Sequence, residues 1–219
     1  MIKCCIFDLD GTLINSLRDL ADAANSALVS LKLPIYDTEK YKQFVGNGVS
    51  KLIERVLPDN YKTDEYKQKM LNIFNENYNR CCLNFTKPYK GISETLDELK
   101  KQNIILAVVS NKPDNQAKKI VNNLFPAVFD DVFGNVAGIA TKPSPDLCLR
   151  VVQNHNIETC DCIFIGDSNV DMLTAANAKM LSVGVTWGFR SRKELENAGA
   201  KFIIDTPQEL LNILKNNKI

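Results

Sequence analysis

The 219-residue sequence predicts an α/β protein in which helices flank a parallel β-sheet and a helical segment is inserted after the first strand. Three observations support this prediction. Six short apolar runs are bounded by turn residues, as expected for strands that are buried on both faces. Segments with helical periodicity separate the later runs, and such alternation produces parallel sheets with right-handed crossovers. Residues 15–87, by contrast, carry helix signals and no convincing strand.

The predicted elements of the sheet and its helices follow from these patterns in chain order. The apolar runs cover residues 2–7, 104–109, 128–133, 162–165, 181–185 and 202–204. Apolar residues spaced three or four positions apart predict helices around residues 92–99, 117–124, 145–152, 170–176 and 210–214. Pro113 and Pro145 suit the first turns of two of these helices, because a backbone N–H there has no partner within the helix.

The inserted segment is expected to be all helical. Ser16 and Asp19 resemble a capping box at the start of its first helix, which is expected over residues 17–31. Further helices are expected to end near Phe44, to cover residues 49–56 and to begin near Thr63. The segment is too long for an ordinary connection between a strand and a helix. The sequence therefore predicts a core formed by residues 1–14 and 88–219, with residues 15–87 as a helical cap.

Composition and charge exclude several classes of protein. Hydrophobic residues make up 45% and charged residues 24% of the chain, as in folded soluble proteins. A net charge of +1 argues against nucleic-acid binding through bulk phosphate neutralisation. No run approaches the roughly 20 apolar residues of a membrane helix, and residues 1–8 become acidic too early for a signal peptide. A cytoplasmic monomer or homodimer without nucleic-acid or membrane partners is therefore expected.

Cysteine and histidine usage narrows the chemistry further. Cys160 and Cys162 lie close together, but no second cysteine pair or histidine cluster completes a zinc site. The total of seven cysteines is odd, which suggests reduced thiols. Because His155 is the only histidine, a histidine-based triad is excluded, and catalytic proton transfer must use other groups.

Four aspartates follow two of the predicted strands. Asp8 and Asp10 come directly after the first strand, and Asp167 and Asp171 follow the fourth. Ligands of open parallel sheets bind at the carboxyl edge, so these side chains form one patch if the two strands are neighbours. A hard divalent cation such as Mg²⁺, which prefers oxygen ligands, would offset their repulsion. The alternative interpretation is a set of turn and helix-capping aspartates.

Two further segments offer groups that bind anions. Ser110 and Asn111 end the second strand and present a hydroxyl, an amide and backbone N–H groups, although they also suit a helix cap before Pro113. Lys142 lies in a proline-rich loop, where it is either a positioned positive charge or part of an ordinary turn before a helix. Four aspartates and one lysine would give the patch a net charge of −3 before a cation binds.

Together these residues resemble the four motifs of haloacid dehalogenase (HAD) superfamily phosphatases. The matching stretches, in the order typical of that superfamily, are DLDGT at 8–12, SNK at 110–112, KPSPD at 142–146 and GDSNVD at 166–171. The helical insert is similar to the C1-type cap of the superfamily, and FVGNGVSKL at 44–52 resembles the cap segment of phosphoglycolate phosphatases. The resemblance implies a Rossmann-like HAD core with an inserted all-helical C1 cap.

The resemblance also implies a mechanism for hydrolysis of phosphomonoesters. Asp8 would attack phosphorus to form an aspartyl-phosphate, and Asp10 would act first as an acid and then as a base. The implied Mg²⁺ ligands are Asp8, Asp167 and the carbonyl of Asp10, with Asp171 acting directly or through water. The groups implied around the phosphoryl oxygens are Lys142, Ser110, Asn111, the backbone of Leu9 and Gly11, and Thr12, which would orient the turn.

The cap is expected to select the substrate. Gly46, Asn47 and Gly48 offer backbone N–H groups, and Lys51 or Arg55 offers charge, to a small carboxylate such as that of 2-phosphoglycolate. An ordinary turn with solvated charges is the alternative. Three other functions stay open: a β-phosphoglucomutase-like sugar-phosphate mutase, a phosphatase for pyrophosphate or nucleoside monophosphates, and a non-catalytic binding domain. The DGT of the first motif and the GNG of the cap segment favour the phosphatase.

Overall fold

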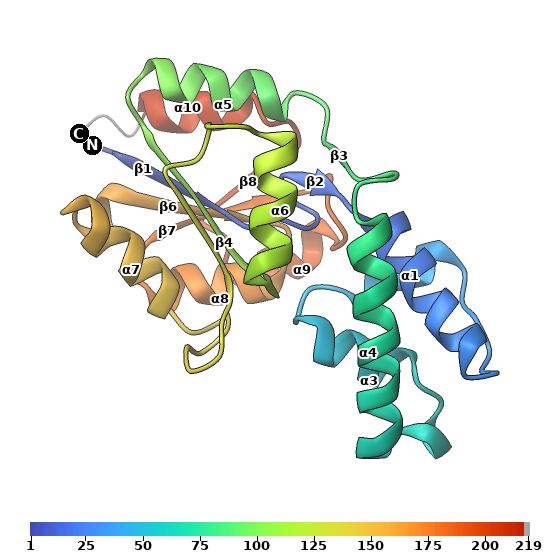
Figure 1. Ribbon diagram of the computed structural model, residues 1–219. Helices are drawn as coiled ribbons and strands as arrows, with labels where there is room; N and C mark the ends of the chain where they lie inside the picture. The colour runs from blue at the N-terminus through green and yellow to red at the C-terminus, as the bar shows by residue number, and fades with distance from the viewer. Residues whose placement is uncertain (217–219) are drawn as a thin grey trace. The chain divides into compact units, whose positions relative to one another are not determined.

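The computed structural model describes residues 1–216 and contains a six-stranded sheet with helices on both sides (Figure 1). The strand order is β5-β4-β1-β6-β7-β8, and each neighbouring pair is parallel. The strands are β1 (Cys4–Phe7), β4 (Ile105–Pro113), β5 (Asp131–Asn135), β6 (Cys162–Gly166), β7 (Leu181–Val185) and β8 (Phe202–Ile204). The predicted α/β class with a parallel sheet is therefore confirmed.

Strand β1 lies at the centre of the sheet, between β4 and β6. Phe7 pairs with Val108 on one side and with Ile165 on the other. The backbone N–H of Asp8 continues this pairing, because it donates to the carbonyl of Ile165 at 2.9 Å. All residues of β1 are buried, which explains its continuous apolar run. The polar residues that follow β1 and β6, and those in the last part of β4, consequently lie at one carboxyl edge of the sheet.

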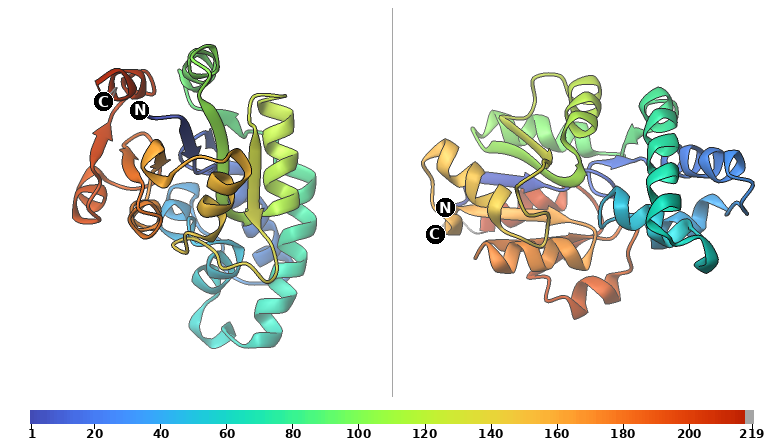
Figure 2. Two further views of the ribbon diagram at one scale, coloured as in Figure 1. Left: turned by 90° about the vertical axis from the view of Figure 1, so that its left-hand side faces the viewer. Right: turned by 60° about the horizontal axis from the view of Figure 1, so that its bottom comes forward.

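Successive residues of β1 face two different helix layers, as the pleat of a strand requires. Cys4 and Ile6 belong to a core cluster with residues of α7 and α8, whereas Phe7 packs near residues of α5 and α10. The turned views show these layers on opposite sides of the sheet (Figure 2). The helices of this unit are α5 (Ile92–Lys101), α6 (Asp114–Leu124), α7 (Asp146–His155), α8 (Asn169–Asn177), α9 (Arg192–Asn197) and α10 (Glu209–Asn216).

Several predicted strand boundaries differ from the observed ones by two residues or more, and the largest differences are at β4 and β5. Strand β4 does not end at residue 109 but continues to Pro113, with an irregular register between Val109 and Pro113. Pro113 therefore precedes helix α6 as its N-cap and is not part of the first turn. Strand β5 begins at Asp131, later than predicted. The apolar residues before it lie in the connection from α6, where Phe129 packs edge-on against Phe7.

Residues Asn15–Lys87 form a second compact unit. Its helices are α1 (Leu17–Ser30), α2 (Tyr41–Phe44), α3 (Val49–Val56) and α4 (Asp64–Cys81), with single turns η1 (Thr38–Lys40) and η2 (Asp59–Tyr61). Helices α1 and α4 pack together, and α4 buries Met70, Phe74 and Tyr78. The boundaries between the two units fall in the short strands β2 (Ile14–Asn15) and β3 (Lys87–Pro88), which the sequence patterns did not predict. No described helix of either unit is both long and apolar enough to cross a membrane.

The predicted capping box of Ser16 and Asp19 is wrong. Ser16 precedes α1 but makes no side-chain capping bond to it. The buried carboxylate of Asp19 instead accepts hydrogen bonds from the backbone N–H groups of Phe85 and Thr86, at 2.9–3.1 Å, and from the Thr86 hydroxyl at 2.7 Å. Asp19 thus links the first helix of this unit to its last segment, and it supplies the acceptor that the buried N–H and hydroxyl of Thr86 require.

Candidate active site

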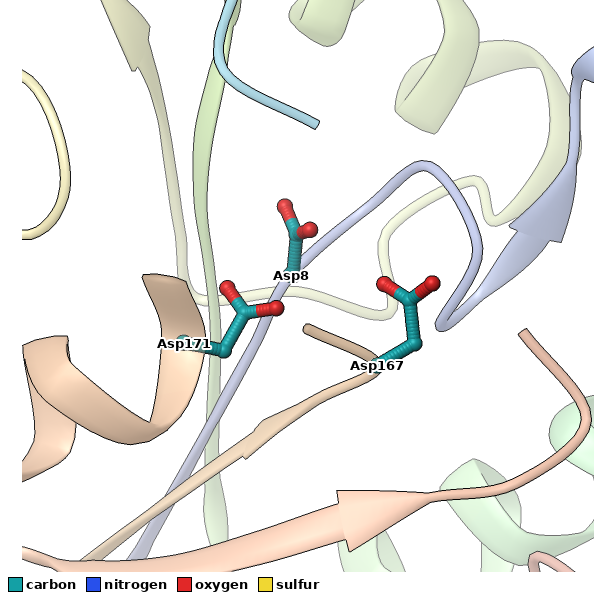
Figure 3. Close-up of side chains that lie close together, drawn as sticks. All are labelled: Asp8, Asp167 and Asp171. Carbon is teal, nitrogen blue, oxygen red and sulfur yellow. The ribbon is translucent and has the colours of Figure 1, made fainter. Parts of the chain in front are cut away.

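Three buried aspartates form a cluster at the carboxyl edge of the sheet (Figure 3). Asp8 follows β1, Asp167 follows the adjacent strand β6, and Asp171 lies in the first turn of α8. One carboxylate oxygen of each lies within 4.8 Å of the others. The sequence predicts one patch on the condition that its first and fourth strands are neighbours. That condition is met, because β1 pairs with β6, and this pairing brings the side chains together.

Lys142 supplies a positive charge inside this cluster. Its ammonium nitrogen lies 2.8 Å from Oδ1 of Asp8 and 2.7 Å from Oδ1 of Asp171, and its side chain is only 2% exposed. Asn111, at the end of β4, positions the lysine: its Oδ1 accepts from the Lys142 N–H at 2.8 Å, and its Nδ2 donates to the Lys142 carbonyl at 3.2 Å. In this structure the Asn111 amide therefore contacts the lysine loop.

Asp171 has two structural partners as well as its place in the cluster. Its Oδ2 accepts from the backbone N–H of Ser168 at 3.0 Å and from the Ser168 hydroxyl at 2.7 Å, which completes a capping box at the start of α8. The helix-capping interpretation is thus correct for Asp171. Because Oδ1 contacts Lys142, both carboxylate oxygens are already engaged within the protein.

Asp167 is held by two segments that are distant in sequence. Its Oδ2 accepts from the backbone N–H of Phe189 at 2.7 Å, and its Oδ1 lies 3.4 Å from the hydroxyl of Thr12. Gly11 adopts φ +89°, and a side chain there would overlap the Asp167 carboxylate. This close approach explains the glycine between Asp10 and Thr12.

Asp10 pairs with Lys112. The sequence motifs include Lys112 in SNK but predict no role for it in the site. The Lys112 ammonium lies 2.8 Å from Oδ2 and 3.0 Å from Oδ1 of Asp10, and the lysine side chain is 3% exposed. The sequence signal that could have identified Lys112 as a site residue was its position directly after Ser110 and Asn111. With Lys112 included, four aspartates and two lysines give the site a net charge of −2, so one divalent cation would neutralise it.

The remaining predicted residues of the first two motifs shape the turn and the strand end. Leu9 is fully buried, and its carbonyl accepts from the N–H groups of Thr12, Leu13 and Ile14, which closes the turn after Asp8. Ser110 is buried at the end of β4, where its hydroxyl accepts from the N–H of Lys112 at 3.3 Å. Because three N–H groups of the turn donate to the Leu9 carbonyl, the turn after Asp8 has little freedom to move relative to β1.

Burial dominates the titration of the cluster. It raises the pKa of Asp8 to about 6, even though the positive charge of Lys142 acts in the opposite direction. Burial, together with the charges of Asp171 and Asp8, also raises the pKa of Asp167 well above its usual range. For Lys142, burial lowers the pKa, but Asp171 and Asp8 outweigh it and hold the pKa above the usual lysine value.

The donor set fits a divalent metal ion. Oxygen atoms from three buried carboxylates converge, and the raised pKa values of Asp8 and Asp167 show that their charges are poorly compensated by the protein alone. A hard cation prefers oxygen ligands of this kind. Asp8 and Asp167 suit a cation better than Asp171 does. Both oxygens of Asp171 have partners at 2.7–3.0 Å. One oxygen of Asp167, by contrast, contacts the Thr12 hydroxyl at the longer distance of 3.4 Å, and Asp8 contacts Lys142 through Oδ1.

The predicted substrate-selecting residues lie in the helical unit. Gly46 and Gly48 have φ values of +113° and +82° on either side of Asn47. The Asn47 Oδ1 accepts from Nη2 of Arg55 at 2.7 Å, and Arg55 also donates to the Phe44 carbonyl at 2.9 Å. Lys51 pairs with Glu54 at 2.7 Å on the exposed face of α3. The two Arg55 hydrogen bonds order the loop, and the loop's contacts with a substrate stay a prediction.

Comparisons with known proteins agree with this architecture. A family model described as haloacid dehalogenase-like hydrolase matches residues 5–185. The chain is 32% identical to the phosphoglycolate phosphatase of Vibrio parahaemolyticus, covering 97% of this chain and 96% of that protein. It is 31% identical to the phosphoglycolate phosphatase of Aquifex aeolicus, covering 99% and 98%.

Solved structures show the same relationship. A crystal structure from Lactobacillus delbrueckii, provisionally assigned as a phosphoglycolate phosphatase, superposes with a TM-score of 0.92 at 32% identity, covering 97% of this chain and 98% of that one. The crystal structure of a hydrolase from Pseudomonas syringae superposes with a TM-score of 0.80 at 26% identity, covering 99% of both chains.

Proposed function

This chain belongs to the haloacid dehalogenase-like hydrolases, and we propose that within this family it is a Mg²⁺-dependent phosphatase for a small phosphorylated metabolite. The observation that carries the proposal is the buried Asp8 carboxylate, which faces Lys142 and Asp167 at the end of the central strand. The relatives named phosphoglycolate phosphatase, which align over nearly the whole chain, support 2-phosphoglycolate as the first candidate substrate.

In the proposed reaction, Asp8 is the nucleophile. A carboxylate oxygen attacks phosphorus and forms an aspartyl-phosphate, while the bond from phosphorus to the ester oxygen breaks and Asp10 gives its proton to the departing alkoxide. Asp10 then takes a proton from a water molecule that attacks the same phosphorus. The Asp8 carboxylate is restored, inorganic phosphate leaves, and the proton on Asp10 is available for the next cycle.

Positive charge around Asp8 is what makes this attack possible. Asp8 and Asp167, with the carbonyl of Asp10, would hold Mg²⁺, and Asp171 would contact it through water. The bound ion supplies positive charge that lowers the repulsion between Asp8 and a phosphate dianion. Lys142 supplies a second charge from a loop fixed by Asn111, and Ser110 offers a hydroxyl at the same edge of the sheet. Phosphoryl transfer depends mainly on such positioning and charge neutralisation.

We further propose that residues 15–87 act as a cap and that the loop Gly46–Gly48 contacts the non-phosphate part of the substrate. A small carboxylate suits a loop with two glycines, because the absence of side chains there lets an anion approach the backbone N–H groups. The cap would also exclude bulk water during the reaction.

The proposal is tested by measuring phosphate release from a panel of phosphate esters. The panel contains 2-phosphoglycolate, β-glucose 1-phosphate, pyrophosphate and nucleoside monophosphates, each with Mg²⁺ and with excess EDTA. We expect the highest kcat/KM for 2-phosphoglycolate, no turnover in EDTA, and a loss of more than about a thousand-fold in Asp8→Asn. Isomerisation of the sugar phosphate without phosphate release would instead identify a mutase, and turnover that persists in Asp8→Asn would contradict the proposed nucleophile.

A further inference from the structure

We propose that residues 186–190, the loop that follows β7, are a positioning element that holds the Asp167 carboxylate and the Asp8–Thr12 turn in place for metal binding. This loop lies outside the four sequence motifs. Three consecutive residues of it contact the site, and each does so in a different way. The inference rests on the proposed metal-dependent function, because the loop acts on the reaction through Asp167.

The first contact comes from Trp187. Its indole Nε1 donates to the backbone carbonyl of Thr12 at 2.9 Å. Thr12 is fully buried, and its hydroxyl in turn approaches Oδ1 of Asp167. The indole therefore anchors the turn that carries Asp10 and Thr12 to the segment after β7, so the turn is fixed at both ends: by β1 at its start and by Trp187 at Thr12.

The second contact comes from Phe189 and acts on the metal-binding carboxylate itself. Its backbone N–H donates to Oδ2 of Asp167 at 2.7 Å. A hydrogen bond to Oδ2 orients the Asp167 carboxylate, so that Oδ1, which lies 3.4 Å from the Thr12 hydroxyl, would be the oxygen offered to a cation. Such supporting bonds commonly decide metal affinity. Because the donor is backbone, the residue type at 189 matters less than the path of the chain.

The third contact explains why glycine occupies position 188, between Trp187 and Phe189. A Cβ atom at position 188 would overlap the Cβ of Asp167 and the carbonyl oxygen of Gly11. The φ of Gly188 lies outside the left-handed region, so glycine is needed there for space and not for backbone conformation. The chain must approach both Asp167 and the catalytic turn at this point if Trp187 and Phe189 are to reach their acceptors.

The loop is itself anchored to the sheet. The Thr186 N–H donates to the carbonyl of Ile204 at 3.1 Å, and its hydroxyl donates to Oδ1 of Asp205 at 2.6 Å. Arg192 pairs with both oxygens of Asp205 at 2.7 Å. A loop tied to β8 at its first residue can act as a rigid support for the turn and for Asp167.

The test measures Mg²⁺ binding directly, with the full chain and Mg²⁺ as the only ligand. Trp187 is the only tryptophan, so both its emission and the NMR signal of its indole N–H report on this loop alone. We expect a saturable change in both signals on Mg²⁺ addition, with the same midpoint as calorimetric binding. Gly188→Ala should weaken Mg²⁺ binding by about 10-fold or more.

Two further variants separate positioning from general instability. Trp187→Phe removes the N–H donor but keeps an aromatic ring, and we expect it to weaken Mg²⁺ binding measurably even if Gly188→Ala does not fold. Gly184→Ala is the matched control, because it lies in the same strand–loop segment but the atoms nearest to its Cβ would be those of the Leu195 side chain, at 3.1 Å or more. We expect Gly184→Ala to bind Mg²⁺ with wild-type affinity.

The possible failures are distinguishable. Wild-type Mg²⁺ affinity in both Gly188→Ala and Trp187→Phe would overturn the inference alone, as would an indole signal that does not respond to saturating Mg²⁺. If the wild-type chain itself binds no Mg²⁺, the proposed metal-dependent function fails, and the inference fails with it.

Discussion

The ammonium group of Lys112 lies within hydrogen-bond distance of both carboxylate oxygens of Asp10, at 2.8 and 3.0 Å. The two residues are 102 positions apart, and the lysine side chain is almost completely buried. The proposed acid–base residue is thus held by a lysine that enters the site from a different strand, while the proposed nucleophile is held by Lys142. The two carboxylates of the first motif therefore pair with different lysines: Asp8 with Lys142 and Asp10 with Lys112.

Replacing Lys112 by methionine should impair the steps that need Asp10. Lys112→Met removes the charge and keeps most of the side-chain volume, so Asp10 loses the partner that fixes its orientation. We expect kcat to fall by about 10- to 100-fold, within the range of general acid–base contributions, with little change in Mg²⁺ affinity. Phosphate-release kinetics and calorimetry measure the two effects. Lys118→Met is the control, because Lys118 is half exposed on α6 and pairs with Asp114. An unchanged kcat in Lys112→Met would contradict this role.

Neutralising Asp8 should stabilise the metal-free protein at neutral pH. Burial raises the pKa of Asp8 to about 6, above the value of about 3.9 expected in the unfolded chain. Its contribution to stability is therefore fully present below about pH 4 and is lost as the pH rises through about 6. In EDTA, Asp8→Asn should exceed the wild type in unfolding free energy at pH 7.5, and the difference should shrink toward pH 4. Denaturant unfolding across this pH range checks the trend. A difference that grows as the pH falls would refute the assignment.

Removing the Asn111 amide should loosen the loop that carries Lys142. Asn111→Ala leaves the buried N–H and carbonyl of Lys142 without the partners they have in this structure, which we expect to lower the unfolding free energy by about 1–3 kcal/mol. Because Lys142 would also be misplaced, kcat/KM should fall. Thermal unfolding and phosphate-release kinetics test both effects. Asn123→Ala, an exposed position on α6, should change neither, and equal behaviour of the two variants would argue against a positioning role.

Asp19 should be a major source of stability within the helical unit. Asp19→Ala removes the shared acceptor of the Phe85 N–H and of the buried N–H and hydroxyl of Thr86, so we expect the free energy of unfolding to fall by about 3 kcal/mol. Asp22→Ala, three residues later on the same helix, removes only a solvent-exposed pair with Arg18 at 3.7 Å and should cost less than about 0.5 kcal/mol. Urea unfolding compares the two. Similar destabilisation by both variants would show that the Asp19 contacts are not specific.

The sheet and the main members of the site could be predicted because their signals are local. Each buried strand is a continuous apolar run, and each run in the site ends in polar residues such as Asp8, Ser110 or Asp167. In a parallel sheet those ends share one edge. The strand boundaries were harder to predict. Strand β4 continues through Ser110–Lys112, where an apolar run cannot mark it, because these residues are polar although they are buried and extended.

The pairings within the site, in contrast, depend on tertiary packing. The sequence by itself determined the fold class, the four motif segments and the aspartates that they carry. Only the tertiary structure decided that Lys112 reaches Asp10, that Asn111 binds the lysine loop and that the segment 186–190 supports Asp167. The physical reason is that these contacts join loops from different strands. A chain with 27 Lys and Arg residues has many possible partners for each carboxylate, and only the strand order and the close approach of loops at the sheet edge select among them.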